Sequence, residues 1–95
     1  MSTARFRLRA GPALEWRTWD DQSVVFDPAS GDTHFFDPVA RAGVTCLSED
    51  AHDASGLATE MARRLDVPLD GSLHTYASRL LILLDDIGLV ETVDE

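Results

Sequence analysis

Apolar and polar residues alternate in the first third of the chain, with the period of a half-buried β-strand. Residues Leu14–Trp19 alternate through Trp16, and Gln22–Phe26 is rich in β-branched and aromatic residues. The Asp20-Asp21 dipeptide lies between these segments as a turn. We therefore expect a hairpin, with Trp16 in the core and Trp19 on the opposite face, packed under the hairpin or partly exposed.

A third strand is predicted over Asp32–Phe36, after a Pro28–Gly31 loop with the proline and glycine of a short hairpin connection. This strand should lie at a sheet edge unless the N-terminal segment Arg5–Arg9 covers it. An edge strand offers main-chain N–H and C=O groups with which a partner peptide can pair. Of the adjacent Phe35 and Phe36, one should be buried and the other partly available. Phe36→Pro is expected to remove a donor and weaken such a partner.

The other two thirds of the chain carry apolar residues at helical spacing. Asp37-Pro38 is typical of a helix start, because Asp caps free N–H groups and Pro fits the first turn. The first helix should end near Leu47, although Gly43 in its interior costs roughly 1 kcal/mol relative to Ala. A second helix is predicted from about Asp53 to Leu65.

A third helix should begin after Asp70 and end before Gly88, which suits a left-handed C-cap. A short final strand is predicted over Leu89–Glu91, followed by a frayed tail at residues 92–95. The core-facing side of the third helix is expected to consist of Leu73, Ala77, Leu80, Leu84 and Ile87.

The five residues Leu80–Leu84 are all apolar and surround the third helix, whereas a surface helix needs only one apolar stripe. A bound peptide or a homodimer face would cover the surplus, and a helix buried on all sides in a small core would also account for this pattern. Tyr76 and Leu83 are two turns apart, with Arg79 between them. These residues would offer an apolar surface with a guanidinium for an acidic peptide residue.

Charge narrows the range of functions. Eight Arg and no Lys stand against 17 Asp and Glu, which gives a net charge of −9 and argues against nucleic-acid binding. With 44% hydrophobic and 26% charged residues, the 95-residue chain should form one globular domain, in which residues 1–12 are an N-terminal arm. Its small core leaves little room for an enclosed active site, so we do not expect an enzyme with a large pocket.

Cys46 is the only cysteine, which rules out an internal disulfide. The chain has neither an apolar run of the ~18 residues that span a bilayer nor a secretory signal, so we expect a cytoplasmic protein without membrane contact. No cofactor motif is present. His34 lies in the predicted edge strand, where it would contact a bound peptide or bond to Asp32 or a turn carbonyl. The histidines are too scattered to indicate a metal site: His34, His52 and His74.

Three strands followed by three helices, the last two joined by a tight Pro-containing turn, form a winged helix-turn-helix pattern of the α+β class. The distinctive residues are Trp16, Trp19, Val24-Val25-Phe26, Ser30-Gly31-Asp32-Thr33-His34, Asp37-Pro38 and Ile87-Gly88-Leu89-Val90. Over roughly residues 14–91 this chain resembles the PqqD family, peptide-chaperone domains also called RiPP recognition elements. It is most similar to the PqqD-like proteins of HPr-rel-A systems, which are encoded beside an HPr-kinase-related protein. It departs from the family at Gly43, where a bulky aliphatic residue is usual.

The resemblance implies a non-enzymatic adaptor without a cofactor, which binds the leader segment of a precursor peptide and presents it to a modifying enzyme or to an HPr-kinase-related partner. In that family the leader pairs as an extra strand along the third strand, beside the third helix. The peptide-binding residues that the resemblance implies here are Asp32, Thr33, His34, Phe35, Phe36, Tyr76, Leu80 and Leu83. Arg79 joins them as a candidate because it lies between Tyr76 and Leu83.

Two other readings remain open. A winged-helix DNA-binding regulator would use the third helix for recognition, but that helix offers only Arg79 as a base and ends in Asp85-Asp86. A structural subunit of an obligate enzyme complex or a homodimer would use the same apolar surface.

Overall fold

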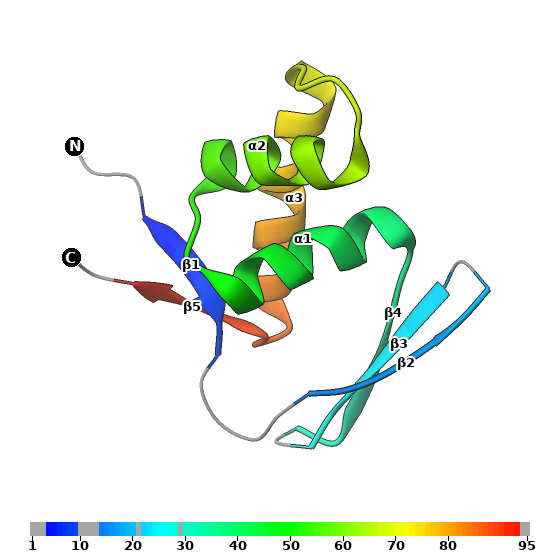
Figure 1. Ribbon diagram of the computed structural model, residues 1–95. Coiled ribbons are helices and arrows are strands. Elements are labelled where there is room, and N and C mark those ends of the chain that lie inside the picture. Colours follow the sequence, from blue (N-terminus) through cyan, green and yellow to red (C-terminus); the bar gives the residue numbers. More distant parts are fainter. Residues whose placement is uncertain (1–3, 10–13, 21, 29, 94–95) are drawn as a thin grey trace.

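The computed structural model describes residues 4–9, 14–20, 22–28 and 30–93 (Figure 1). The chain adopts an α+β fold with a winged-helix-like arrangement, in which a three-stranded antiparallel sheet precedes three helices, as predicted. The elements are β1 (Arg5–Leu8), β2 (Glu15–Trp19), β3 (Gln22–Asp27), β4 (Asp32–Phe36), α1 (Pro38–Glu49), α2 (Ala54–Leu65), α3 (Gly71–Asp86) and β5 (Val90–Val93).

The strands β2, β3 and β4 form a meander whose bounds match the predicted ones to within one residue. Asp20 in the β2–β3 turn has a φ of 51°, and Gly31 before β4 has a φ of 78°. Both values lie in the left-handed region that tight hairpin connections require. The turn residues therefore set the register that leaves β4 at one edge of the sheet.

A second sheet, absent from the prediction, pairs β1 with β5 in antiparallel register. The N-terminal arm thus does not cover β4 in the described residues, and the predicted frayed tail is corrected because Thr92 and Val93 belong to β5. Cross-strand bonding and an ion pair between Arg7 and Glu91 at 3.0 Å hold these ends together. Residues 94–95 lie outside the described residues.

Each helix starts as its sequence predicts, at an Asp whose carboxylate accepts a hydrogen bond from a backbone N–H three residues later. The first helix extends two residues beyond the predicted end at Leu47. None of the described helices has the length and hydropathy of a membrane span. The capping bonds are Asp37 to Ala40 N (2.8 Å), Asp53 to Gly56 N (2.7 Å) and Asp70 to Leu73 N (3.0 Å).

The core lies where the three helices meet and continues to the inner face of the sheet. Gly43 of α1 is buried at this meeting point. A Cβ atom at Gly43 would lie 2.5 Å from Cδ2 of Leu80 and 3.2 Å from Sδ of Met61. The glycine that weakens α1 as an isolated helix therefore lets α1 approach α2 and α3 closely.

A buried ion pair connects the two sheets. Asp27, at the end of β3, is fully buried and accepts bonds of 3.0 and 3.1 Å from Nη2 of Arg9. The same guanidinium donates to the carbonyl of Gly88, just before β5. Because a buried carboxylate needs a charged partner, Arg9 fixes the chain after β1 against the meander.

Candidate functional site

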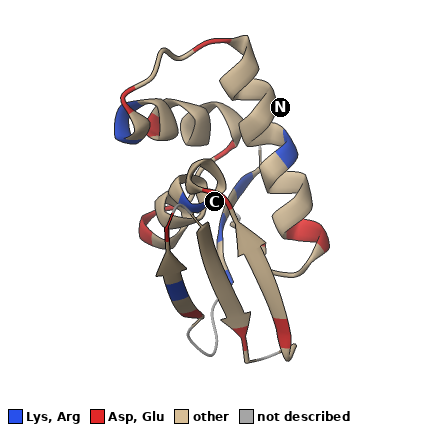
Figure 2. Cartoon of the chain, turned by 90° about the vertical axis from the view of Figure 1, so that its right-hand side faces the viewer, with Lys and Arg blue, Asp and Glu red and all other residues tan. Residues whose placement is uncertain are grey.

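The strand β4 is an edge strand. It pairs with β3 on one side, and no strand pairs with its other side in the part of the chain that the structure describes. Figure 2 shows the outer face of the sheet, with α3 beyond β4 at the right. The expectation of an uncovered third strand therefore holds for the described residues.

The hairpin register shows which main-chain groups of β4 are unpaired. Trp19 and Gln22 are opposite each other across a two-residue turn, so they form the hydrogen-bonded pair that closes such a hairpin. Bonding then alternates along the strand. Gln22 and each second residue after it in β3 form main-chain hydrogen bonds with β2. Ser23 and each second residue after it form such bonds with β4.

Ser23 is opposite Phe36, and Val25 is opposite His34. The main-chain groups of Phe36 and His34 are therefore used within the sheet, while those of Thr33 and Phe35 point to the open edge. This overturns the expectation for Phe36→Pro, which would break the internal ladder. The donors open to a partner belong to Thr33 and Phe35.

The side chains of β4 also alternate. Phe35 is 70% exposed on the outer face of the sheet, whereas Phe36 is 5% exposed on the inner face, with its ring centroid 6.0 Å from that of Trp16. One phenylalanine is thus core and the other available, as predicted. Trp19 is also exposed, on the same outer face as Phe35. In Figure 2, charged residues of the sheet lie mainly at the strand ends.

Helix α3 approaches the end of β4 through Tyr76. The hydroxyl of Tyr76 donates a hydrogen bond of 3.4 Å to Oδ1 of Asp37, the residue directly after β4. Leu83 lies seven residues after Tyr76 and therefore on the same side of the helix, with Arg79 between them. Leu83 is 50% exposed. Among the described residues, no hydrogen bond or ion pair engages Arg79. We call the set Thr33, Phe35, Tyr76, Arg79 and Leu83 the β4–α3 surface.

Leu80 and Phe36 are corrected as candidate contact residues. Both are 5% exposed and belong to the hydrophobic core, so their side chains are not available to a partner. Asp32 is exposed at the start of β4. The Nε2 atom of His34 is buried without a hydrogen-bond partner in the described residues, so the expected bond to Asp32 or to a turn carbonyl is absent at that atom.

Burial raises the pKa of Tyr76 to about 12, and the negative charge and hydrogen bond of Asp37 add to this shift. The phenol is a donor at neutral pH, and its bond to Asp37 connects the end of β4 to α3. Burial also raises the pKa of the Cys46 thiol. Cys46 is 1% exposed, which makes it a core residue. Among the described residues, no three His, Cys, Asp or Glu side chains cluster as a metal site requires.

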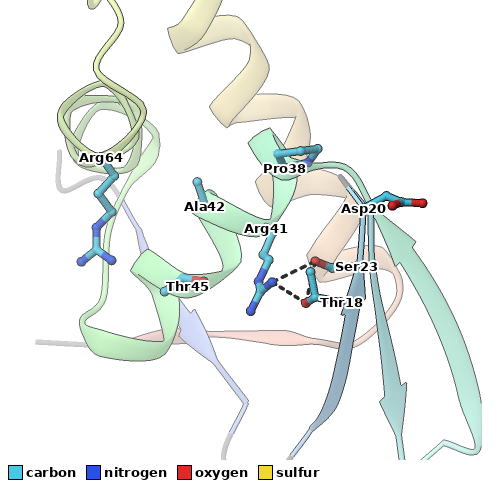
Figure 3. Close-up of a pocket in the computed structure, with 8 residues that line it drawn as sticks. All are labelled: Thr18, Asp20, Ser23, Pro38, Arg41, Ala42, Thr45 and Arg64. Atoms are coloured by element: carbon cyan, nitrogen blue, oxygen red, sulfur yellow. Dashed lines mark hydrogen bonds between the residues drawn. The ribbon is translucent and has the colours of Figure 1, made fainter.

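A second feature, which was not predicted from the sequence, is a cavity of about 350 Å³ between α1, the end of α2 and the β2–β3 hairpin (Figure 3). Arg41 of α1 crosses it and donates from Nη1 to the hydroxyls of Thr18 and Ser23, the latter at 3.2 Å. The cavity combines residues from four separate segments, so no local motif marks it. Its lining consists of Thr18, Asp20, Ser23, Pro38, Arg41, Ala42, Thr45 and Arg64.

Comparisons of the chain with protein-family models, with curated proteins and with solved structures found no match.

Proposed function

We propose that this protein is a non-enzymatic, PqqD-like peptide-binding adaptor, which holds the leader segment of a precursor peptide as an added strand along β4 and presents it to a modifying enzyme or an HPr-kinase-related partner. The observation that carries the proposal is the open edge of β4 beside α3. In this proposal the encounter takes place in the cytoplasm, where precursor peptides are synthesised.

The open edge supplies affinity that depends little on peptide sequence. Thr33 and Phe35 each present one N–H and one C=O to a partner. A guest strand that bonds to these groups continues the meander and removes the unpaired edge.

Specificity would come from the side chains on the two faces of the extended sheet. Guest residues opposite Thr33 and Phe35 point to the outer face, where the exposed ring of Phe35 can pack against an apolar residue. The intervening guest residues point inward, towards α3. There Leu83 favours an apolar residue, and the guanidinium of Arg79, which pairs with no described residue, favours a carboxylate.

The experiment that tests this function is a fluorescence-anisotropy titration of the purified chain with labelled synthetic leader segments of the precursor peptides encoded near its gene. Saturable binding with one peptide per monomer is the expected result. Leu83→Asp should weaken binding about tenfold or more, because half of a leucine surface and its apolar contact are lost and a carboxylate takes their place.

Leu69→Asp is the matched control, because Leu69 is 54% exposed but lies in the connection between α2 and α3. It should bind as the wild type does. Equal loss in both variants, or no binding of any leader segment, would contradict the proposal. Salt-sensitive binding to DNA in a mobility-shift assay would favour a regulator instead, and a stable dimer in light scattering would favour a subunit interface.

A further inference from the structure

Two arginines, Arg41 and Arg64, line the cavity in Figure 3. Arg64, at one side, bonds to Glu49 (Nη1 to Oε2, 3.1 Å) and lies 3.6 Å from a carboxylate oxygen of Glu60. Arg41 pairs with no carboxylate among the described residues, and Asp20 points away from it in Figure 3. Arg41 is therefore a partly buried guanidinium with no anionic partner in the described part of a chain whose net charge is −9.

The hydrogen bonds of Arg41 to described residues leave the Nε–Nη2 edge of its guanidinium unoccupied. Both bonds in the described residues, to Thr18 and Ser23, come from Nη1. The parallel N–H groups of Nε and Nη2 therefore remain available, and this fork matches two oxygens of one oxyanion. The ring of Trp16, with its centroid 5.5 Å from Cζ, helps to hold the guanidinium in place.

The hydroxyl groups add further donors. Because Thr18 and Ser23 accept bonds from Arg41, their own hydrogens point elsewhere. The two oxygens are 3.4 Å apart, so one hydroxyl can donate to the other, and the hydrogen of the second is left for a ligand. Thr45 places a third hydroxyl in the lining, between Arg41 and Arg64 in Figure 3.

We infer that this cavity is a binding site for a phosphoryl group, either free phosphate or a small phosphate ester. A tetrahedral oxyanion can place two oxygens on the Nε–Nη2 fork and turn a third towards the hydroxyls. A planar carboxylate meets the fork but has no third oxygen for the hydroxyls. The cavity volume lies within the range of small-ligand sites. This inference does not depend on peptide binding at β4.

The test is thermal unfolding of the chain with inorganic phosphate, O-phosphoserine, acetate or chloride at equal ionic strength. A ligand that binds only the folded state raises Tm. Phosphate should raise Tm above the chloride value, whereas acetate should not. A rise with O-phosphoserine as well assigns the site to esters, and a rise with phosphate alone assigns it to the free ion. Equal effects of phosphate, acetate and chloride would overturn the inference.

Arg41→Met should weaken phosphate binding about tenfold or more, since the loss of hydrogen bonds from a charged donor is costly. Arg79→Met, which removes a guanidinium from the β4–α3 surface, should leave phosphate binding unchanged. Equal loss in both variants would show that only overall charge matters.

If Arg41→Met does not fold, NMR of the wild-type chain decides whether phosphate binds in this cavity. Phosphate should shift the indole N–H signal of Trp16 and the Nε–H signal of Arg41, while Trp19 on the outer face is the internal reference. Unmoved Trp16 and Arg41 signals, or equal shifts of both indoles, would refute the assignment.

Discussion

Replacing Thr33 by proline should weaken peptide binding without unfolding the protein. Thr33 is exposed on β4, and its N–H points away from β3, so the substitution removes a donor only from the open edge. Proline is tolerated in edge strands when its missing N–H faces solvent. Thr33→Ala is the matched control, because it shortens the side chain but keeps the N–H.

The number of main-chain hydrogen bonds that are lost, one in Thr33→Pro, sets the expected loss of binding free energy. A main-chain hydrogen bond contributes a net ~1 kcal/mol, and a guest carbonyl left without its donor raises the loss to about 3 kcal/mol. The Kd of a leader peptide should therefore rise about five- to 150-fold in Thr33→Pro. In Thr33→Ala it should stay within about twofold of wild type.

Anisotropy titrations give the Kd of each variant, and circular dichroism melts report whether each one is folded. Folded Thr33→Pro that binds a leader peptide as tightly as Thr33→Ala would refute strand addition. Unfolding of Thr33→Pro would instead show that this N–H bonds within the sheet, against the register argument.

Three further predictions concern α3 and its contacts. Leu84→Ala should lower the free energy of unfolding by about 2–5 kcal/mol in urea titrations, because Leu84 is fully buried, while Leu83→Ala should lower it by less than about 1 kcal/mol; equal losses would mean that Leu83 is core. Gly43→Ala should destabilise the chain by up to about 2 kcal/mol despite the better helix propensity of alanine, because a Cβ overpacks the helix junction; a more stable variant would contradict this packing. Tyr76 is the only tyrosine, so ultraviolet titration should show its phenol ionising with a pKa of about 12. In Asp37→Asn the pKa of Tyr76 should be lower but still above its ordinary value, because burial is the larger cause of the shift. An unchanged midpoint in this variant would exclude the contribution of Asp37.

The raised pKa of Tyr76 also predicts a direction for alkaline stability. The folded state favours the neutral phenol, so the stabilisation is fully present below the ordinary value of 10.0 and is lost as pH rises towards about 12. Because Tyr76 is only half-buried, this contribution is small beside the whole free energy of unfolding.

The local elements could be predicted because their signals are local. The capping aspartates mark the helix starts, and the turn residues Asp20 and Gly31 mark the hairpins. The sheet of β1 and β5 could not be predicted, because it joins two four-residue strands from opposite ends of the chain. Pairing over such a separation leaves no local pattern.

The candidate site was predictable only in part. Periodicity indicates that Leu80–Leu84 surrounds α3, but it cannot show that Leu80 and Leu81 are covered while Ile82 and Leu83 are not. That division depends on where α2, α1 and β5 pack against α3. Arg41 also escaped prediction, since its hydroxyl partners lie 18 and 23 residues away in sequence.

Hydrogen exchange at individual amides of β4 tests the central claim most directly. In the free, monomeric chain, NMR should find rapid exchange at Thr33 and Phe35 and slow exchange at His34 and Phe36, which bond to β3. A bound leader peptide should slow exchange at Thr33 and Phe35. Slow exchange at these two amides in the free chain, or no change when a leader peptide binds, would contradict an open edge that receives a guest strand.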